Sequence, residues 1–137
     1  VALAILMPIV ASMGGIAGIQ SMTIMVRAQA LGRITTSNIR WLFTRETVVG
    51  FINGLIWATI VSLLSYLWFH DQLVSIALAG AMVINLLIGS ALGVMLPIFL
   101  ERNNIDPANA GGVILTTFTD IIGFVAFLGI ASMLYFN

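Results

Sequence analysis

Four long apolar segments constrain the fold of this chain more than any other feature of its sequence. They cover residues 2–31, 47–69, 73–100 and 110–136. A helix that crosses a bilayer needs roughly 20 mainly apolar residues, and each segment reaches that length. Open sheet edges are not tolerated in lipid, because every backbone polar group there needs a partner. The segments therefore predict an all-α, polytopic transmembrane helical bundle with four spans.

The composition supports this class. Hydrophobic residues make up 61% of the 137 and charged residues only 7%, whereas a soluble domain carries about 25% charged residues. A net charge of zero leaves no basic surface for nucleic acid, and the absence of cysteine excludes disulfides and thiolate metal sites. The chain starts at Val1 inside an apolar segment. We therefore expect one transmembrane domain over 1–137, as a fragment of a longer protein.

The positions of the basic residues predict the topology. The connection between the second and third segments carries no basic residue, while the other two connections and the end of the first segment carry all five. If the segments alternate across the membrane, the positive-inside rule makes 32–46 and 101–109 cytoplasmic and puts the C-terminus outside. The five basic residues are Arg27, Arg33, Arg40, Arg45 and Arg102.

Each cytoplasmic connection has a helix-start signal. Thr36 or Ser37 can cap a short helix that contains Trp41. Because a tryptophan suits the headgroup zone, we expect this helix to be interfacial. Asp106 followed by Pro107 predicts an N-cap and a first helical residue. We therefore expect the last helix to begin near 107.

Asp120 is the only acidic residue inside the four segments. A carboxylate at this depth costs on the order of 3 kcal/mol unless it faces water, a cation or a partner. Thr116, Thr117 and Thr119 precede it within about one turn, and their hydroxyls can form hydrogen bonds with water or with a ligand. We interpret Asp120 as a site on a cation path. The alternative is a buried aspartate that is protonated, or that bonds Thr116 and a neighbouring helix.

One carboxylate per chain is too few for a complete protein cage around a metal. Magnesium fits this limit best, because it keeps several waters and is usually held by one or two carboxylates. A homodimer would bring two copies of Asp120 together. The backbone carbonyl of Thr116, one turn earlier, is a candidate second ligand.

Small residues predict close helix packing. Three segments carry Gly-x-x-x-Gly, a spacing that lets helix backbones approach in lipid. Gln20 and Ser21 follow such glycines, and both pore lining and packing remain open for them. Asn53 and Asn85 are expected to form hydrogen bonds between helices. The three glycine pairs are Gly14/Gly18, Gly50/Gly54 and Gly89/Gly93.

Enzyme chemistry is not expected. The only histidine, His70, lies in a connection, so no Ser/His pair forms at membrane depth. There is no P-loop and no Gly-x-Gly-x-x-Gly motif.

The order of motifs resembles the MgtE family of magnesium transporters over nearly the whole chain. The resemblance lies in Gly14-Gly-Ile-Ala-Gly-Ile-Gln-Ser21 with Arg27-Ala28 and Leu31-Gly32, in Arg45-Glu46 with Gly50 and Gly54, in Pro97, in Asp106-Pro107-Ala108, and in Thr116-Thr117-x-x-Asp120-x-x-Gly123.

The resemblance implies a homodimer in a bacterial inner membrane, with a pore lined by 2–31 and 110–136. It implies that Asp120 from both subunits holds hydrated Mg²⁺, with the Thr116 carbonyl close by. It also implies a preceding membrane helix, a cytoplasmic N-terminal domain and paired CBS domains outside this fragment. The pore-lining residues would be Gly14, Gly15, Gly18, Gln20, Ser21, Gly112, Thr117 and Gly123.

One departure from the family pattern concerns the pore. Ile16 stands where the family usually has Asn, and Ile19 where Asn or Thr is common. Loss of an amide there removes a water-ordering group and could dry or narrow the path.

We therefore expect inward, channel-like conduction of Mg²⁺, the transported ion. The alternatives are a transporter of Co²⁺ or Zn²⁺, a proton-coupled carrier that uses Asp120, and a non-conducting module that assembles through its glycine faces.

Overall fold

The chain folds into four long helices. The computed structural model describes residues 2–35 and 37–136, apart from the side chains of residues 2, 3, 108 and 109. The predicted all-α class is confirmed, and no strand occurs in these described residues. The helices are α1 (Ala2–Ala30), α2 (Ile39–Phe69), α3 (Gln72–Arg102) and α4 (Pro107–Phe136).

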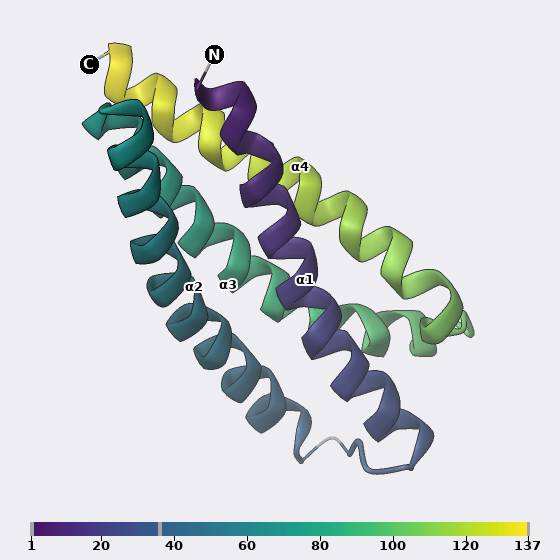
Figure 1. Cartoon of the computed structure of the whole chain (residues 1–137). Helices are drawn as coiled ribbons and strands as arrows, with labels where there is room; N and C mark the ends of the chain where they lie inside the picture. Colours follow the sequence, from purple (N-terminus) through teal and green to yellow (C-terminus); the bar gives the residue numbers. More distant parts are fainter. Residues whose placement is uncertain (1, 36, 137) are drawn as a thin grey trace.

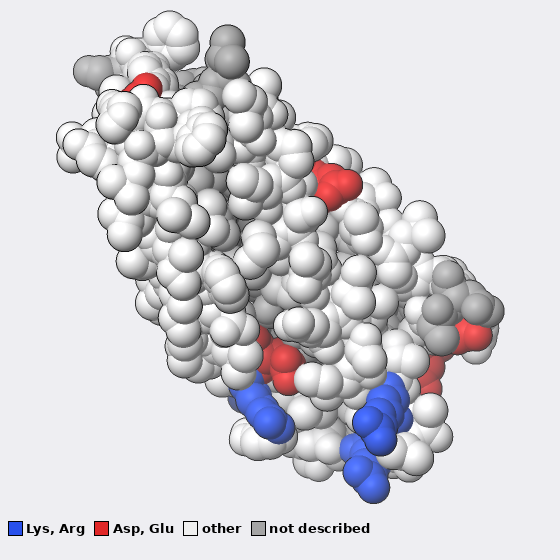
Figure 2. Space-filling view, viewed as in Figure 1, with Lys and Arg blue, Asp and Glu red and all other residues white. Residues whose placement is uncertain are grey.

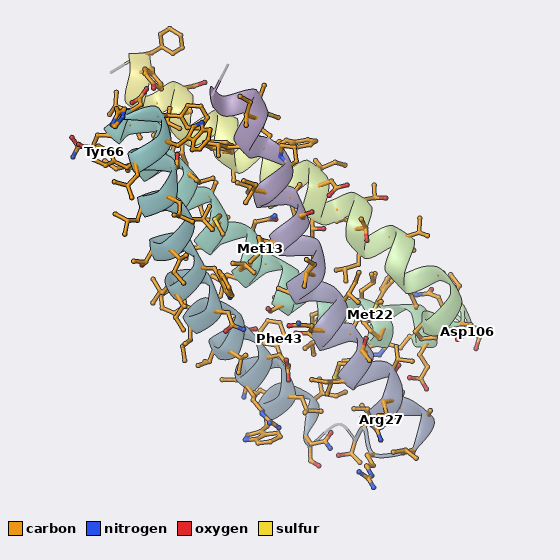
Figure 3. The ribbon with its side chains drawn as sticks, in the orientation of Figure 1. Met13, Met22, Arg27, Phe43, Tyr66 and Asp106 are labelled. Carbon is orange, nitrogen blue, oxygen red and sulfur yellow. The ribbon has the colours of Figure 1, made fainter. Side chains whose placement is uncertain are left out.

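The interfacial helix expected before the second span is wrong as a separate element. Residues 39–46 are the first turns of α2, which runs without interruption to Phe69. No glycine or proline breaks this stretch. Its apolar residues Ile39, Leu42 and Phe43 pack against a buried cluster around Met25, and Phe43 points from α2 toward α1 (Figure 3). Packing therefore extends the helix past the boundary that the arginines suggest.

The start of α2 is also capped differently from the prediction. Thr36 lies outside the described residues, and Ser37 precedes the N-cap, which is Asn38. The Asn38 side chain accepts from the Thr35 N–H at 2.8 Å and donates to the Arg33 carbonyl at 2.7 Å. It thus folds the connection back on itself. The α4 prediction is confirmed, since that helix begins at Pro107.

Helix α3 is the centre of the bundle. It packs against each of the other three helices, whereas α1 and α2 hardly touch. Figure 1 shows α1 and α4 side by side, with both chain ends at one end of the bundle. Because α3 is surrounded, small residues that face its neighbours decide how closely the helices approach.

Glycines form the contact between α1 and α3. A Cβ added at Gly89 would lie 2.5 Å from the Gly14 carbonyl oxygen, and one at Gly18 would lie 2.9 Å from the Gly89 carbonyl oxygen. On α2, a Cβ at Gly54 would lie 3.2 Å from the Val83 Cα. The predicted packing role of the glycine pairs is therefore confirmed.

All four helices are long and apolar enough to cross a membrane, judged by length and composition. Large apolar side chains remain exposed along α2 and α4, which suits a surface in contact with lipid. In Figure 2 basic atoms appear only at the end of the bundle where α1 ends and α2 begins. The structure thus gathers visible positive charge at one end, as the topology prediction requires.

At the opposite end of the bundle, Asp71 links the α2–α3 turn to α4. Its Oδ1 accepts from the Leu73 and Val74 N–H groups and caps α3, while its Oδ2 accepts from the Tyr135 hydroxyl of α4. The Tyr135 hydrogen bond, aided by the two backbone bonds, lowers the pKa of Asp71 below its ordinary value of 3.8. The end of α4 is therefore tied to the α2–α3 turn.

Replacing Gly89 with Ala should destabilise the fold by about 1–3 kcal/mol, because the new methyl group meets a backbone carbonyl that cannot move aside. Gly129→Ala is the matched control, since nothing lies within 4 Å of a Cβ there. Unfolding in detergent followed by circular dichroism measures both. Equal stability of the two variants would contradict the packing described here.

Tyr135→Phe should raise the pKa of Asp71 toward its ordinary value, because the bond that favours the carboxylate is lost. In the wild type this stabilisation is present above about pH 3.8 and is lost as pH falls through the lowered pKa. A carbon-13 NMR titration of the Asp71 carboxyl measures it. Tyr66→Phe serves as control, and an unchanged Asp71 pKa in the Tyr135 variant would refute the tie.

Candidate functional site

Asp120 lies near the middle of α4, away from both ends of the bundle. Its side chain is partly exposed. Within the described residues its carboxylate accepts no hydrogen bond and forms no ion pair. The alternative in which Asp120 bonds Thr116 is therefore not the arrangement in this structure. An accessible carboxylate without a protein partner is open to a ligand from solvent.

The threonines beside Asp120 bond to the backbone of their own helix. The Thr117 hydroxyl donates to the Val113 carbonyl at 2.8 Å, and the Thr119 hydroxyl donates to the Thr116 carbonyl at 3.1 Å. A hydroxyl that donates in this way still has lone pairs that can accept from water. Thr116 and Thr117 are exposed, so their oxygens could contact the water shell of an ion, while Thr119 is fully buried.

Helix α1 lies opposite this part of α4. A Cβ at Gly15 would lie 3.6 Å from the Thr119 hydroxyl oxygen, which puts Gly15 opposite the turn before Asp120. On α1, Ser12, Ile16 and Ile19 are exposed at spacings of four and three residues and so share one helix face. The exposed face of α1 and the exposed threonines of α4 thus both border the contact between α1 and α4.

Most of the other glycines predicted to line the pore lie at helix contacts within this chain. Gly14 and Gly123 both make room for Asn85, Gly18 approaches Gly89 and Leu115, and Gly112 is near Met22. In Figure 3, Met22 lies on the side of α1 that faces α4, in the half of the bundle that contains Arg27. Pore lining by these glycines stays a prediction, and their contacts explain their small size without it.

Asn85 is fully buried on α3, and its Nδ2 donates to the Val10 carbonyl of α1 at 2.8 Å. The predicted hydrogen bond between helices is confirmed for this residue. Asn53 behaves differently. It is half-buried and lines a cavity of about 200 Å³ between α1 and α2 together with Gln20, and it makes no side-chain hydrogen bond within the described residues.

No group of three or more His, Cys, Asp or Glu side chains that could hold a metal occurs in the described part of the chain. The described residues thus offer Asp120 no cluster of such side chains, and further ligands would come from backbone or hydroxyl oxygens, from water or from another chain.

Comparison with known proteins decides the family. The sequence model of MgtE, described as a divalent cation transporter, matches residues 7–130. The chain belongs to the MgtE family. With its four apolar helices, this makes it an integral membrane protein.

Three proteins with the name magnesium transporter MgtE are similar to this chain. That of Bacillus subtilis is 31% identical over 132 residues, that of Thermus thermophilus 29% over 133, and that of Enterococcus faecalis 26% over 131. The matches cover 96–97% of this chain but only 29% of each relative. The chain thus corresponds to under a third of the length of these MgtE transporters.

Within this MgtE chain, Ile16 and Ile19 are 53% and 42% exposed. They therefore do not fill the helix core. Both positions are on the accessible side of α1, and Ile16 also lines the cavity that Gln20 and Asn53 share.

The sequence analysis names Glu46 as part of the family pattern but gives it no role in a site. Because α2 begins at Ile39, Glu46 is a second acidic residue inside a spanning helix, and it is only 6% exposed. Its Oε2 accepts from the Ser21 hydroxyl at 3.0 Å. A signal was available in the sequence, since Glu46, Gly50 and Gly54 repeat every four residues and form one buried face.

Proposed function

We propose that this chain is the membrane domain of a magnesium transporter, and that it conducts hydrated Mg²⁺ inward through a pore between two copies. The observation that carries the proposal is Asp120, a partly exposed carboxylate in mid-helix with no hydrogen-bond or ion-pair partner in the described residues. We take the ion from the names of three similar proteins, each of which is a magnesium transporter. We propose transport and not catalysis, because the matched family is described as a divalent cation transporter.

The chemistry of magnesium favours a shared site. Mg²⁺ dehydrates reluctantly and is held by one or two carboxylates with its remaining waters in place. A single Asp120 leaves one positive charge uncompensated in a low-dielectric surrounding, whereas two copies neutralise the ion. A homodimer with the Asp120 faces of α4 toward the two-fold axis provides this pair.

The oxygens near Asp120 extend the site along α4. Thr116 and Thr117 lie one turn before it and are exposed. In the proposed pore their hydroxyls accept hydrogen bonds from the waters of the ion, whereas the Thr116 carbonyl already accepts from the Thr119 hydroxyl. Gly112 carries no side chain that would narrow this part of the passage.

The arginines suggest the orientation of the chain, and the membrane potential then sets the direction of transport. With the arginine-rich end in the cytoplasm, the chain sits in a bacterial inner membrane with its C-terminus outside. The membrane potential then contributes about 2.3 kcal/mol per charge for each 100 mV, and so acts twice on a divalent ion. In the full-length protein, we expect a preceding membrane helix and cytoplasmic domains, including CBS domains, to control the pore from the arginine end.

Asp120→Asn should lower magnesium flux at least about tenfold, because loss of ~1.4 kcal/mol of attraction already changes site occupancy by that factor. Flux is measured in liposomes that contain the full-length protein and a magnesium-sensitive dye. Glu101→Gln is the matched control, since it removes an exposed carboxylate at the end of α3.

Unchanged flux in the Asp120 variant at equal protein content would refute the ion site. Competition at equal free ion concentrations separates the rival cations. Displacement of Mg²⁺ by low Co²⁺ or Zn²⁺ would favour a transporter of those ions, and flux that requires a proton gradient would favour a carrier.

Ile16→Asn should increase flux severalfold, because an amide on the accessible face of α1 orders water where the isoleucine repels it. Fold stability should change by less than about 0.5 kcal/mol, because the position is exposed. The same liposome assay and detergent unfolding measure both quantities. Ile24→Asn, also exposed on α1, is the control, and an equal response of the two variants would contradict a specific role for position 16.

A further inference from the structure

Helices α1 and α2 have little holding them together directly. Each packs on α3, and they hardly touch one another. A cavity of about 200 Å³ lies between them, lined by Met13 and Gln20 of α1 and by Trp57 of α2. Packing alone therefore does little to fix how α1 is turned relative to α2.

One side-chain hydrogen bond crosses from α1 to α2 in the described residues. The Ser21 hydroxyl of α1 donates to Oε2 of Glu46 of α2 at 3.0 Å. Both residues are buried, at 3% and 6% exposure. A buried carboxylate is costly without a partner, so the bond to Ser21 is strongly favoured over its loss.

The surrounding glycines make this bond possible. A Cβ at Gly93 of α3 would lie 2.7 Å from the Ser21 Cβ and 3.1 Å from the Met22 nitrogen. A Cβ at Gly50 of α2 would meet the Ser90 hydroxyl of α3. The missing side chains let α1 and α2 both settle onto α3, close enough for Ser21 to reach Glu46.

Ser21 also lies on the helix that carries the accessible positions of the proposed pore. Ile16, Ile19 and Thr23 are exposed on α1, whereas Ser21 is buried. Because these residues belong to one rigid helix, a rotation of α1 that moved Ser21 away from Glu46 would move the exposed face as well.

We propose that the Ser21–Glu46 hydrogen bond is a latch that fixes the rotation of α1, and that Glu46 is a positioning residue for ion conduction. The inference rests on the proposed function for its effect on flux. It predicts that the hydrogen-bond acceptor at position 46 matters and that the negative charge does not.

The test uses the full-length protein in liposomes with a magnesium-sensitive dye. Ser21→Ala and Glu46→Ala should each lower maximal flux about tenfold, the factor that corresponds to the loss of one hydrogen bond of ~1.4 kcal/mol. The magnesium concentration at half-maximal flux should stay within about twofold, because Asp120 is untouched. Glu46→Gln and Ser21→Thr keep an acceptor and a donor, and they should restore flux to within about twofold of the wild type.

The double variant Ser21→Ala/Glu46→Ala should match either single variant, because both remove the same bond. Ser65→Ala is the matched control, since it removes a buried α2 hydroxyl that has no hydrogen-bond partner. It should leave flux unchanged. A merely structural role would lower protein amount and thermal stability without this pattern of coupling and rescue.

A second measurement requires no transport. The chain has no cysteine, so spin labels can be placed on Ile24→Cys of α1 and Val48→Cys of α2, both exposed positions. Pulsed electron resonance should show a shifted or broadened distance distribution when Ser21→Ala is added, and an unchanged one with Glu46→Gln.

Unchanged distances and unchanged flux in Ser21→Ala would overturn the latch, as would failure of Glu46→Gln to restore the wild-type distance. If the wild-type protein passes no magnesium, the proposed function fails. The label distances still decide the latch in that case.

Discussion

The close approach of the α1 and α3 backbones is the contact on which the rest of the structure depends. Methyl groups added at Gly18, Gly89 or Gly93 would meet a backbone carbonyl oxygen of the facing helix, and one added at Gly14 would meet the Asn85 side chain. In lipid, helices gain little from hydrophobic burial, so association relies on such van der Waals contact and on hydrogen bonds. This contact puts α1 on the central helix, and the positions of Asn85, Ser21 and the accessible face of α1 follow from it.

Asn85 joins three helices at the centre of this contact. Its amide donates to Val10 of α1, and the missing side chains of Gly14 and Gly123 leave room for it. Gly123 lies one turn after Asp120 on α4, so the same asparagine helps to set the depth and rotation of the helix that carries the carboxylate. A polar residue with a modest hydrogen bond thereby determines geometry more than stability.

The sequence was sufficient to predict four helices, the small-residue contacts and the isolated position of Asp120, because hydropathy and residue spacing are local properties. It placed the start of the second helix too late, since Arg40 and Arg45 suggest a polar connection while Leu42 and Phe43 pack against residues far away in the chain. For the same reason Glu46 was taken as part of a loop. Its partner Ser21 lies 25 residues earlier, and only the tertiary structure shows that the two side chains meet.

The tie between Tyr135 and Asp71 has a consequence for the motions of the bundle. It joins the last turn of α4 to the start of α3 through one side-chain hydrogen bond. A displacement of the last turn of α4 must therefore either carry the first turn of α3 with it or break this bond.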